Sequence, residues 1–217
     1  MSNYDTILFD LDGTLFDTES GVKKSISYSL DAFGYKYTPE VLHAMIGPPF
    51  RVSMKKFFGV DPENSEKFIK KYREHYTEFG WYDCKPFDGV EQLLIDLKSA
   101  GFRLAVATSK PIFFTNQIIN KFGFDKYFDF VGGALSDCSR DTKSSVINFV
   151  LEGLNIEDKS KVVIVGDRLY DIEGAHLSGI DSIAILWGYG NLKEFNDYKA
   201  TYILDTPSDV YNFLTAK

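Results

Sequence analysis

Three aspartates lie close together near the N-terminus, in the stretch FDLDGTLFD that spans residues 9–17. Asp10, Asp12 and Asp17 all follow an apolar run that ends at Phe9. At ~4 Å and an effective dielectric of ~20, two such charges repel by ~4 kcal/mol, so a bare cluster is unfavourable. A bound cation would offset this repulsion, and carboxylate oxygens are ligands that hard divalent ions such as Mg²⁺ prefer.

Polar residues also follow two later apolar runs. Thr108 and Ser109 come directly after residues 104–107, and Asp167 and Asp171 come after residues 162–165. In open parallel sheets, ligands bind outside the carboxyl ends of the strands. We therefore expect Asp10 and Asp167 to lie at neighbouring strand ends and to form an oxygen-lined site for a divalent cation.

A lysine, Lys143, begins the helical stretch that precedes residues 162–165. Together with the hydroxyl groups of Thr108 and Ser109, it would supply hydrogen-bond donors and one positive charge. These groups suit the equatorial oxygens of a phosphoryl group, so we expect a phosphate to bind beside the cation. Lys110 and Arg168 are expected to be ordinary solvated charges.

The elements that must position these residues alternate along the chain. Short apolar runs predict strands over residues 6–9, 104–107, 128–131, 162–165, 182–186 and 202–204. Helical periodicity predicts helices over residues 90–99, 113–122, 143–154, 171–178 and 207–215. This alternation indicates an α/β fold, with a doubly wound parallel sheet that helices cover on both faces.

An insert of about 65 residues follows the first strand and lacks strand-like patterns. Its periodicity predicts helices over residues 19–33, 39–45, 51–58 and 63–79. The chain passes between insert and core near residues 16–19 and 84–89, which is the anatomy of a hinged lid. We therefore predict a core domain of residues 1–18 and 85–217, with an inserted helical cap domain of residues 19–84.

Composition excludes several classes of protein. The net charge of −7, from 31 acidic and 24 basic residues, disfavours binding to nucleic acid. The only cysteines, Cys84 and Cys138, are too few for a disulfide framework and are expected to be free thiols in a reducing cytosol. No run approaches the ~18 apolar residues of a membrane span. We expect a cytoplasmic protein, monomeric or homodimeric, with no membrane partner.

The sequence lacks the motifs of several other classes of phosphate-processing enzyme. Neither cysteine begins a Cys-x5-Arg loop, and no Gly-x4-Gly-Lys-Ser/Thr loop occurs. The histidines lack metal-site spacing; they are His43, His75 and His176. These observations argue against cysteine-dependent phosphatases, P-loop enzymes and histidine-rich dinuclear phosphatases.

The stretch Asp-x-Asp-Gly-Thr-Leu at residues 10–15 resembles the first signature of the haloacid dehalogenase (HAD) superfamily. Matches to all four sequence motifs of that family occur in order along essentially the whole chain: Asp10 and Asp12 for the first motif, Thr108 for the second, Lys143 for the third, and Asp167 with Asp171 for the fourth. The helical insert matches the cap that the family places between its first and second motifs.

This resemblance implies a reaction. Asp10 would be the nucleophile that forms an aspartyl-phosphate, and Asp12 the general acid and base. It also implies that Mg²⁺ is held by Asp10, by the backbone carbonyl of Asp12 and by Asp167, while Asp171 ligates through water or orients the other ligands. Lys143 would neutralise both Asp10 and the phosphate. The implied activity is hydrolysis of a small phosphorylated metabolite.

The subfamily is indicated by VGDRLYDIEGAHLSGI at residues 165–180 and AILWGYG at residues 184–190, which are similar to the phosphoglycolate phosphatase and 5′-nucleotidase-like branch. A phosphosugar mutase is the main alternative. That branch often has Glu-Asp where this chain has Gly166-Asp167, and Gly-x-Ser-Arg where it has residues 47–51, GPPFR. Both departures favour a hydrolase.

Two further alternatives stay open at this point, a receiver-type signalling domain and a non-catalytic regulator. Arg51, beside the predicted cap loop, is a weak candidate for substrate choice. Asp171 could instead interact with the dipole of a helix N-terminus.

Overall fold

The computed structural model describes residues 3–48, 50–135 and 139–216. The chain forms two compact units, one made of Met1–Phe16 and Pro86–Lys217 and the other of Asp17–Lys85. Two residues discussed above, Pro49 and Cys138, lie outside the described part of the chain. The thiol of Cys84 is half-buried and donates a hydrogen bond to the carbonyl of Trp81 at 3.5 Å.

The larger unit is built on a six-stranded parallel sheet with the order β5-β4-β1-β6-β7-β8. Its strands are β1 (Thr6–Phe9), β4 (Arg103–Pro111), β5 (Phe130–Ala134), β6 (Val162–Gly166), β7 (Asp181–Ile185) and β8 (Tyr202–Leu204). The central strands β1 and β6 are buried along their whole length, because helices cover both faces of a parallel sheet. The predicted α/β doubly wound sheet is confirmed.

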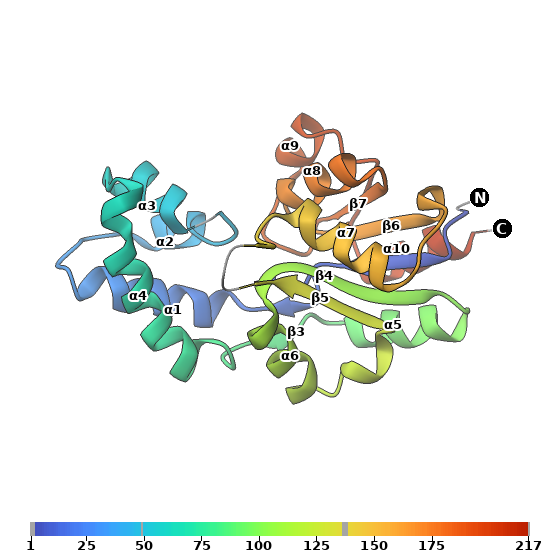
Figure 1. Ribbon diagram of the computed structural model, residues 1–217, viewed down its shortest axis with the longest axis horizontal. Coiled ribbons are helices and arrows are strands. Elements are labelled where there is room, and N and C mark those ends of the chain that lie inside the picture. The colour runs from blue at the N-terminus through green and yellow to red at the C-terminus, as the bar shows by residue number, and fades with distance from the viewer. Residues whose placement is uncertain (1–2, 49, 136–138, 217) are drawn as a thin grey trace. The chain divides into compact units, whose positions relative to one another are not determined.

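Helices form a layer on each face of this sheet (Figure 1). On one side α7 (Lys143–Gly153) packs beside α8 (Leu169–Ser178), and on the other α5 (Val90–Ser99) packs beside α10 (Pro207–Thr215). α6 (Ile112–Lys121) packs against β4 and β5. The core between α7 and the sheet is formed by small and branched apolar residues such as Leu8, Ala107 and Val146.

Local sequence explains where two important helices begin. Thr142 caps α7, since its hydroxyl accepts a hydrogen bond from the backbone N–H of Ser145. Asp171 stabilises the first turn of α8, because its carboxylate accepts a hydrogen bond from the backbone N–H of Arg168 at 3.0 Å. Both caps place site residues, Lys143 and Asp171, in a first helical turn.

The smaller unit is helical. It contains α1 (Glu19–Asp31), α2 (Pro39–Ala44), α3 (Phe50–Phe58), α4 (Glu66–His75) and two short helices of other types, η1 (Pro62–Ser65) and η2 (Tyr76–Gly80). The prediction of one continuous helix over residues 63–79 was wrong, because a 3₁₀ turn precedes α4 and a π turn follows it. Met54 and Phe68 are fully buried in its core. The role of this unit as a cap stays a prediction.

Several short elements were not predicted from the sequence. β2 (Phe16–Asp17) and β3 (Lys85–Pro86) pair as a two-stranded sheet where the chain passes from one unit to the other. The larger unit also contains α9 (Leu192–Asp197), η3 (Asp125–Tyr127) and η4 (Lys159–Lys161). Each has at most six residues, too few to establish a helical period.

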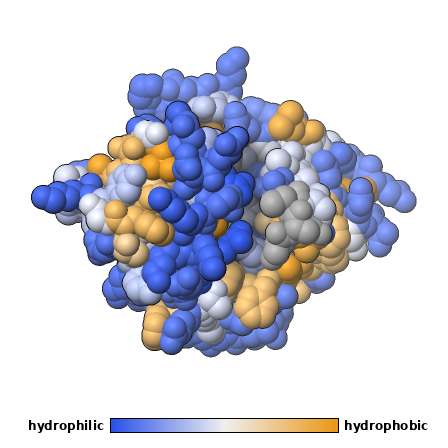
Figure 2. Space-filling model, turned by 60° about the vertical axis from the view of Figure 1, so that its left-hand side comes forward, coloured by the Kyte–Doolittle hydropathy of each residue, from blue (hydrophilic) through white to orange (hydrophobic). Residues whose placement is uncertain are grey.

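The surface is predominantly polar on the side that Figure 2 presents, where hydrophobic residues occur as separate patches. Among the described helices, none has both the length and the apolar character needed to cross a membrane.

Candidate active site

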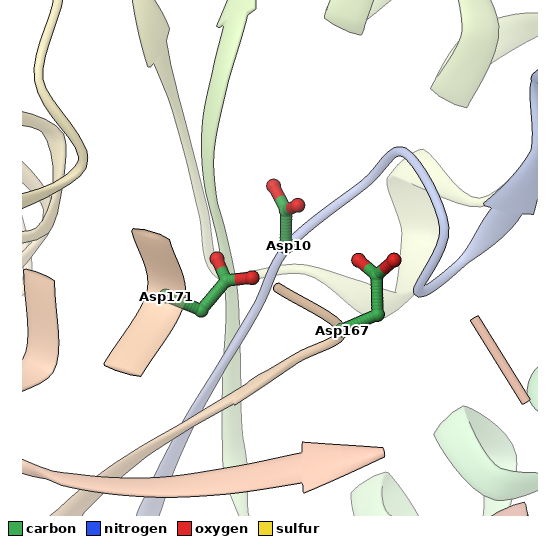
Figure 3. A group of neighbouring side chains, drawn as sticks. All are labelled: Asp10, Asp167 and Asp171. Atoms are coloured by element: carbon green, nitrogen blue, oxygen red, sulfur yellow. The ribbon is translucent and has the colours of Figure 1, made fainter. Parts of the chain in front are cut away.

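Three adjacent strands of the sheet bring the predicted site residues to one edge. Asp10 directly follows β1, Thr108 lies near the end of β4, and Asp167 directly follows β6. β4, β1 and β6 are neighbours in the sheet, so the three residues lie at its carboxyl edge. The carboxylates of Asp10, Asp167 and Asp171 point in the same general direction in Figure 3.

The ammonium of Lys143 lies between two of these carboxylates. Its Nζ is 2.7 Å from Asp10 Oδ1 and 2.6 Å from Asp171 Oδ1, and it donates a hydrogen bond to the carbonyl of Ala107 at 3.1 Å. All three charged side chains are buried. Thr108 adds a side-chain hydrogen bond to Asp10. The nucleophile candidate is therefore fixed by two donors from different elements.

Burial and the ion pair act in opposite directions on the pKa of Asp10 and on the pKa of Lys143. Burial raises the pKa of Asp10 from 3.8 to about 6; Lys143 opposes the rise and the neighbouring Asp171 adds to it. Burial alone would lower the pKa of Lys143, but the charges of Asp10 and Asp171 outweigh it and hold that pKa above its ordinary value. Lys143 thus stays charged at neutral pH.

Asp167 is completely buried and accepts hydrogen bonds from two segments. The Thr14 hydroxyl donates to its Oδ1 at 3.2 Å, and the backbone N–H of Tyr189 donates to its Oδ2 at 2.9 Å. Burial raises the pKa of Asp167 well above 3.8, and the nearby charges of Asp171 and Asp10 raise it further. Ionised Asp167 therefore needs a compensating positive charge.

Glycines allow the chain to approach Asp167 closely. A Cβ at Gly13 would lie 2.2 Å from Asp167 Oδ2, and Gly13 also has a positive φ of 80° that disfavours other residues. A Cβ at Gly188 would lie 2.3 Å from both Asp167 Cβ and the carbonyl oxygen of Gly13. Any side chain at either position would displace the carboxylate or the loop beside it.

The acidic cluster fits a divalent cation. One oxygen each from Asp10, Asp167 and Asp171 can be chosen so that all lie within 4.8 Å of one another, and all three residues are buried. Lys143 supplies a single positive charge against these three carboxylates, which leaves the ionised cluster negative. A hard cation with two charges would offset that excess, and carboxylate oxygens match the ligand preference of Mg²⁺.

Asp12 has a different partner. The Nζ of Lys110 lies 2.9 Å from both carboxylate oxygens of Asp12. The side chain of Lys110 is only 4% exposed, so the prediction of a solvated lysine was wrong. A lysine can be buried where the fold places a carboxylate within reach of its ammonium. Here that carboxylate is 98 residues away in the sequence.

Arg168 also departs from the prediction of a solvated charge. Its guanidinium pairs with Glu194 at 3.0 Å, and both side chains are mostly buried. The same Glu194 carboxylate accepts a hydrogen bond from the backbone N–H of Leu169 at 2.7 Å. This pair therefore connects α9 to the N-terminus of α8, next to Asp167.

Three weaker candidates have local roles or exposed positions. Asp17 accepts a hydrogen bond from the backbone N–H of Glu19 at 3.2 Å, at the beginning of α1. Ser109 is exposed on β4. Arg51, in the first turn of α3, pairs with Glu66 on the surface of the helical unit. Their contributions to substrate binding stay predictions.

Sequence reasoning missed three residues that contact the site. Besides Thr14 and Tyr189, Trp187 donates a hydrogen bond from its indole N–H to the carbonyl of Thr14 at 3.0 Å. Thr14 belongs to the Asp-Gly-Thr-Leu stretch, and the other two belong to the sequence WGYG after β7. All three lie in the segments that follow β1 and β7 at the carboxyl edge of the sheet, and this position was the available signal.

Comparison with known proteins identifies a family that this chain matches. A family model described as haloacid dehalogenase-like hydrolase matches residues 7–185. A 5′-nucleotidase of Pseudomonas aeruginosa is 34% identical over 203 residues, covering 92% of this chain and 90% of the relative. A phosphoglycolate phosphatase of Aquifex aeolicus is 30% identical over 209 residues, covering 96% of this chain and 95% of the relative.

Two further similarities have high coverage of this chain. The tyrosine-protein kinase PtkA of Mycobacterium tuberculosis is 37% identical over 200 residues, covering 91% of this chain and 67% of the relative. The crystal structure of a predicted phosphatase from Clostridium acetobutylicum has a TM-score of 0.91 and 36% identity, covering 97% of this chain and 98% of that one.

Proposed function

Because the chain belongs to the haloacid dehalogenase-like hydrolases, we propose that it is a Mg²⁺-dependent phosphomonoesterase that acts through an aspartyl-phosphate intermediate. Relatives named 5′-nucleotidase and phosphoglycolate phosphatase support phosphatase activity. They also support a small phosphorylated metabolite as the substrate.

One observation carries the proposal: Asp10 is held by Lys143 at 2.7 Å within a buried cluster of three carboxylates. A structural salt bridge needs one acid for one base. Here two more buried acids accompany the pair, and a bound cation would offset the cost of burying their negative charges. A carboxylate nucleophile beside a cation and a lysine is suited to attack at phosphorus.

In the first half-reaction, a carboxylate oxygen of Asp10 attacks phosphorus, and the bond from phosphorus to the alcohol oxygen breaks. Asp12 gives its proton to the departing alcohol. In the second, Asp12 takes a proton from a water molecule as the water oxygen attacks the phosphorus of the aspartyl-phosphate. Inorganic phosphate leaves, and Asp10 is regenerated as a carboxylate. One proton moves in each direction, so Asp12 also returns to its starting state.

The other residues hold charge. Mg²⁺, bound by Asp10, Asp167 and the backbone carbonyl of Asp12, would supply positive charge beside the phosphate oxygens. Lys143 neutralises Asp10, which reduces its repulsion of an anionic substrate, and Thr108 orients the same carboxylate. Asp171 is the second carboxylate that contacts the Lys143 ammonium. Uncatalysed monoester hydrolysis is so slow that enzymes accelerate it by up to ~10²¹-fold, so all these contributions are needed.

The test is release of inorganic phosphate from a panel of phosphoglycolate, nucleoside monophosphates and sugar phosphates, with Mg²⁺ and with EDTA. We expect Mg²⁺-dependent release by the wild-type protein and a loss of several orders of magnitude in Asp10→Asn, with folding retained. Activity that persists in Asp10→Asn would overturn the nucleophile assignment.

Product identity separates the alternatives in the same assay. Isomerisation of a sugar 1-phosphate without phosphate release would instead identify a mutase. Because one relative is named a tyrosine-protein kinase, the assay includes a further arm with ATP and a tyrosine peptide. Transfer of phosphate to the peptide, with no release to water, would contradict the hydrolase proposal.

A further inference from the structure

Lys110 holds the Asp12 carboxylate by both of its oxygens. Its Nζ is equidistant from the two oxygens of Asp12, at 2.9 Å from each. The lysine side chain is 4% exposed whereas that of Asp12 is 30% exposed, so the pair is anchored on the lysine side. Asp12 keeps an accessible edge.

The end of β4 places Lys110 rigidly. Its backbone N–H donates a hydrogen bond to the Thr108 hydroxyl at 3.2 Å, and the Thr115 hydroxyl donates to its carbonyl at 3.4 Å. The pairing of β4 with β5 shifts register between Thr108 and Pro111. Gly133 makes this possible, because a Cβ there would lie 2.9 Å from the Lys110 carbonyl oxygen.

Alternation along β4 gives each catalytic aspartate its own partner. Thr108 and Lys110 are two residues apart and buried, while Ser109 between them is exposed, as expected for side chains on opposite faces of a strand. Thr108 hydrogen-bonds Asp10, and Lys110 pairs with Asp12. One strand end therefore positions both the nucleophile and the acid.

We infer that Lys110 is a positioning residue that aims the Asp12 carboxylate at the leaving oxygen of the substrate. This inference rests on the proposed function, in which Asp12 gives its proton to the departing alcohol. An alkoxide needs that proton in order to leave, whereas p-nitrophenolate leaves without it. Loss of Lys110 therefore affects the hydrolysis of alkyl phosphates more than that of aryl phosphates.

The experiment compares kcat/KM for glycerol phosphate and p-nitrophenyl phosphate in Lys110→Met, at saturating Mg²⁺. A misplaced general acid costs ~10²-fold or more, so we expect a loss of that size with glycerol phosphate. The loss with p-nitrophenyl phosphate should stay below ~10-fold. Lys110→Arg, which keeps the charge, should recover part of the activity on glycerol phosphate and little on the aryl ester.

Lys98→Met is a matched control, since Lys98 also contacts both oxygens of an aspartate, Asp129, at 2.9 Å, but in a partly exposed pair. We expect Lys98→Met to leave kcat/KM unchanged for both substrates. Equal losses on both esters in Lys110→Met, or a raised KM with unchanged kcat, would overturn the inference, because Lys110 would then bind phosphate.

Folding of the variants is checked by circular dichroism. If Lys110→Met does not fold, the same comparison is made with Lys110→Gln and Lys110→Arg, and the absence of a leaving-group difference in both overturns the inference. A wild-type protein that releases no phosphate from any ester contradicts the proposed function itself. If the wild-type protein does release phosphate, a negative result with the Lys110 variants contradicts only the role of Lys110.

Discussion

Lys143 and Asp10 form a buried ion pair at 2.7 Å, with Lys143 Nζ also 2.6 Å from Asp171. This relationship brings together the end of β1 and the first turns of α7 and α8. It makes one lysine responsible for most of the charge compensation of two carboxylates.

Replacing Lys143 with Met should therefore destabilise the protein. Two buried carboxylates would lose their partner, and removal of one member of a buried pair costs about 3–5 kcal/mol. Urea unfolding of the metal-free protein measures this change. Lys143→Met/Asp171→Asn should recover part of the loss, because one of the two stranded charges is then neutral. A single variant within ~1 kcal/mol of wild type, the value for exposed pairs, would show that the ion pair is unimportant for stability.

Metal-free protein should become less stable as pH rises from 3.8 through about 6. The pKa of Asp10 is raised from 3.8 to about 6, chiefly by burial, and that of Asp167 is raised in the same direction. A raised carboxyl pKa means that the folded state favours the protonated form. This contribution is complete below pH 3.8 and is lost as pH rises through the folded-state value. Lys143 stays charged throughout the window, so it does not reverse the trend.

The magnitude follows from the shift. A change of two pKa units corresponds to about 3 kcal/mol, or ~5–10 °C in the unfolding midpoint of a chain of this size. Thermal unfolding in EDTA and in excess Mg²⁺ checks it: the stabilisation by Mg²⁺ should grow with pH. Asp10→Asn should flatten the EDTA profile. A midpoint independent of pH in EDTA would contradict the assigned burial of these charges.

Gly188→Ala should weaken activation by Mg²⁺. The added Cβ would lie 2.3 Å from Asp167 Cβ, so the carboxylate or the loop must move. We expect the Mg²⁺ concentration for half-maximal activity to rise at least ~10-fold, as is typical when groups that orient metal ligands are lost. Gly123→Ala is the control: its φ of 67° makes alanine unfavourable there, but no atom lies within 4 Å of its Cβ. An unchanged Mg²⁺ requirement in Gly188→Ala would contradict the assignment of Asp167.

The fold was largely predictable because buried parallel strands have a strong signature. β1 and β6 contain the apolar runs of residues 7–9 and 162–165, and an aspartate directly follows each strand, which marks both the strand and its carboxyl end. That pattern predicted the proximity of Asp10 and Asp167 in space. α9 and the pair β2 and β3 were not predictable in this way, because two to six residues do not define a period.

Lys110 and Arg168 show what the sequence could not provide. Burial of a lysine or arginine depends on a partner carboxylate, and the partners Asp12 and Glu194 are 98 and 26 residues away. The position of Tyr189 after β7 indicated that it lies near the site, but its hydrogen bond to Asp167 could not be predicted, because a backbone N–H carries no residue signature. Tertiary contacts, rather than local patterns, decide the surroundings of the candidate site.

The most direct test of the account is to trap phosphate on Asp10. In Asp12→Asn, p-nitrophenyl phosphate can still form the aspartyl-phosphate, but no base remains to activate water. An acid quench after mixing labelled substrate with excess enzyme, followed by peptide mass spectrometry, should find phosphate on the peptide that contains Asp10. Asp10→Asn/Asp12→Asn should carry none. Phosphate attached to another residue, or released at the wild-type rate without any labelled Asp10, would contradict the central claim.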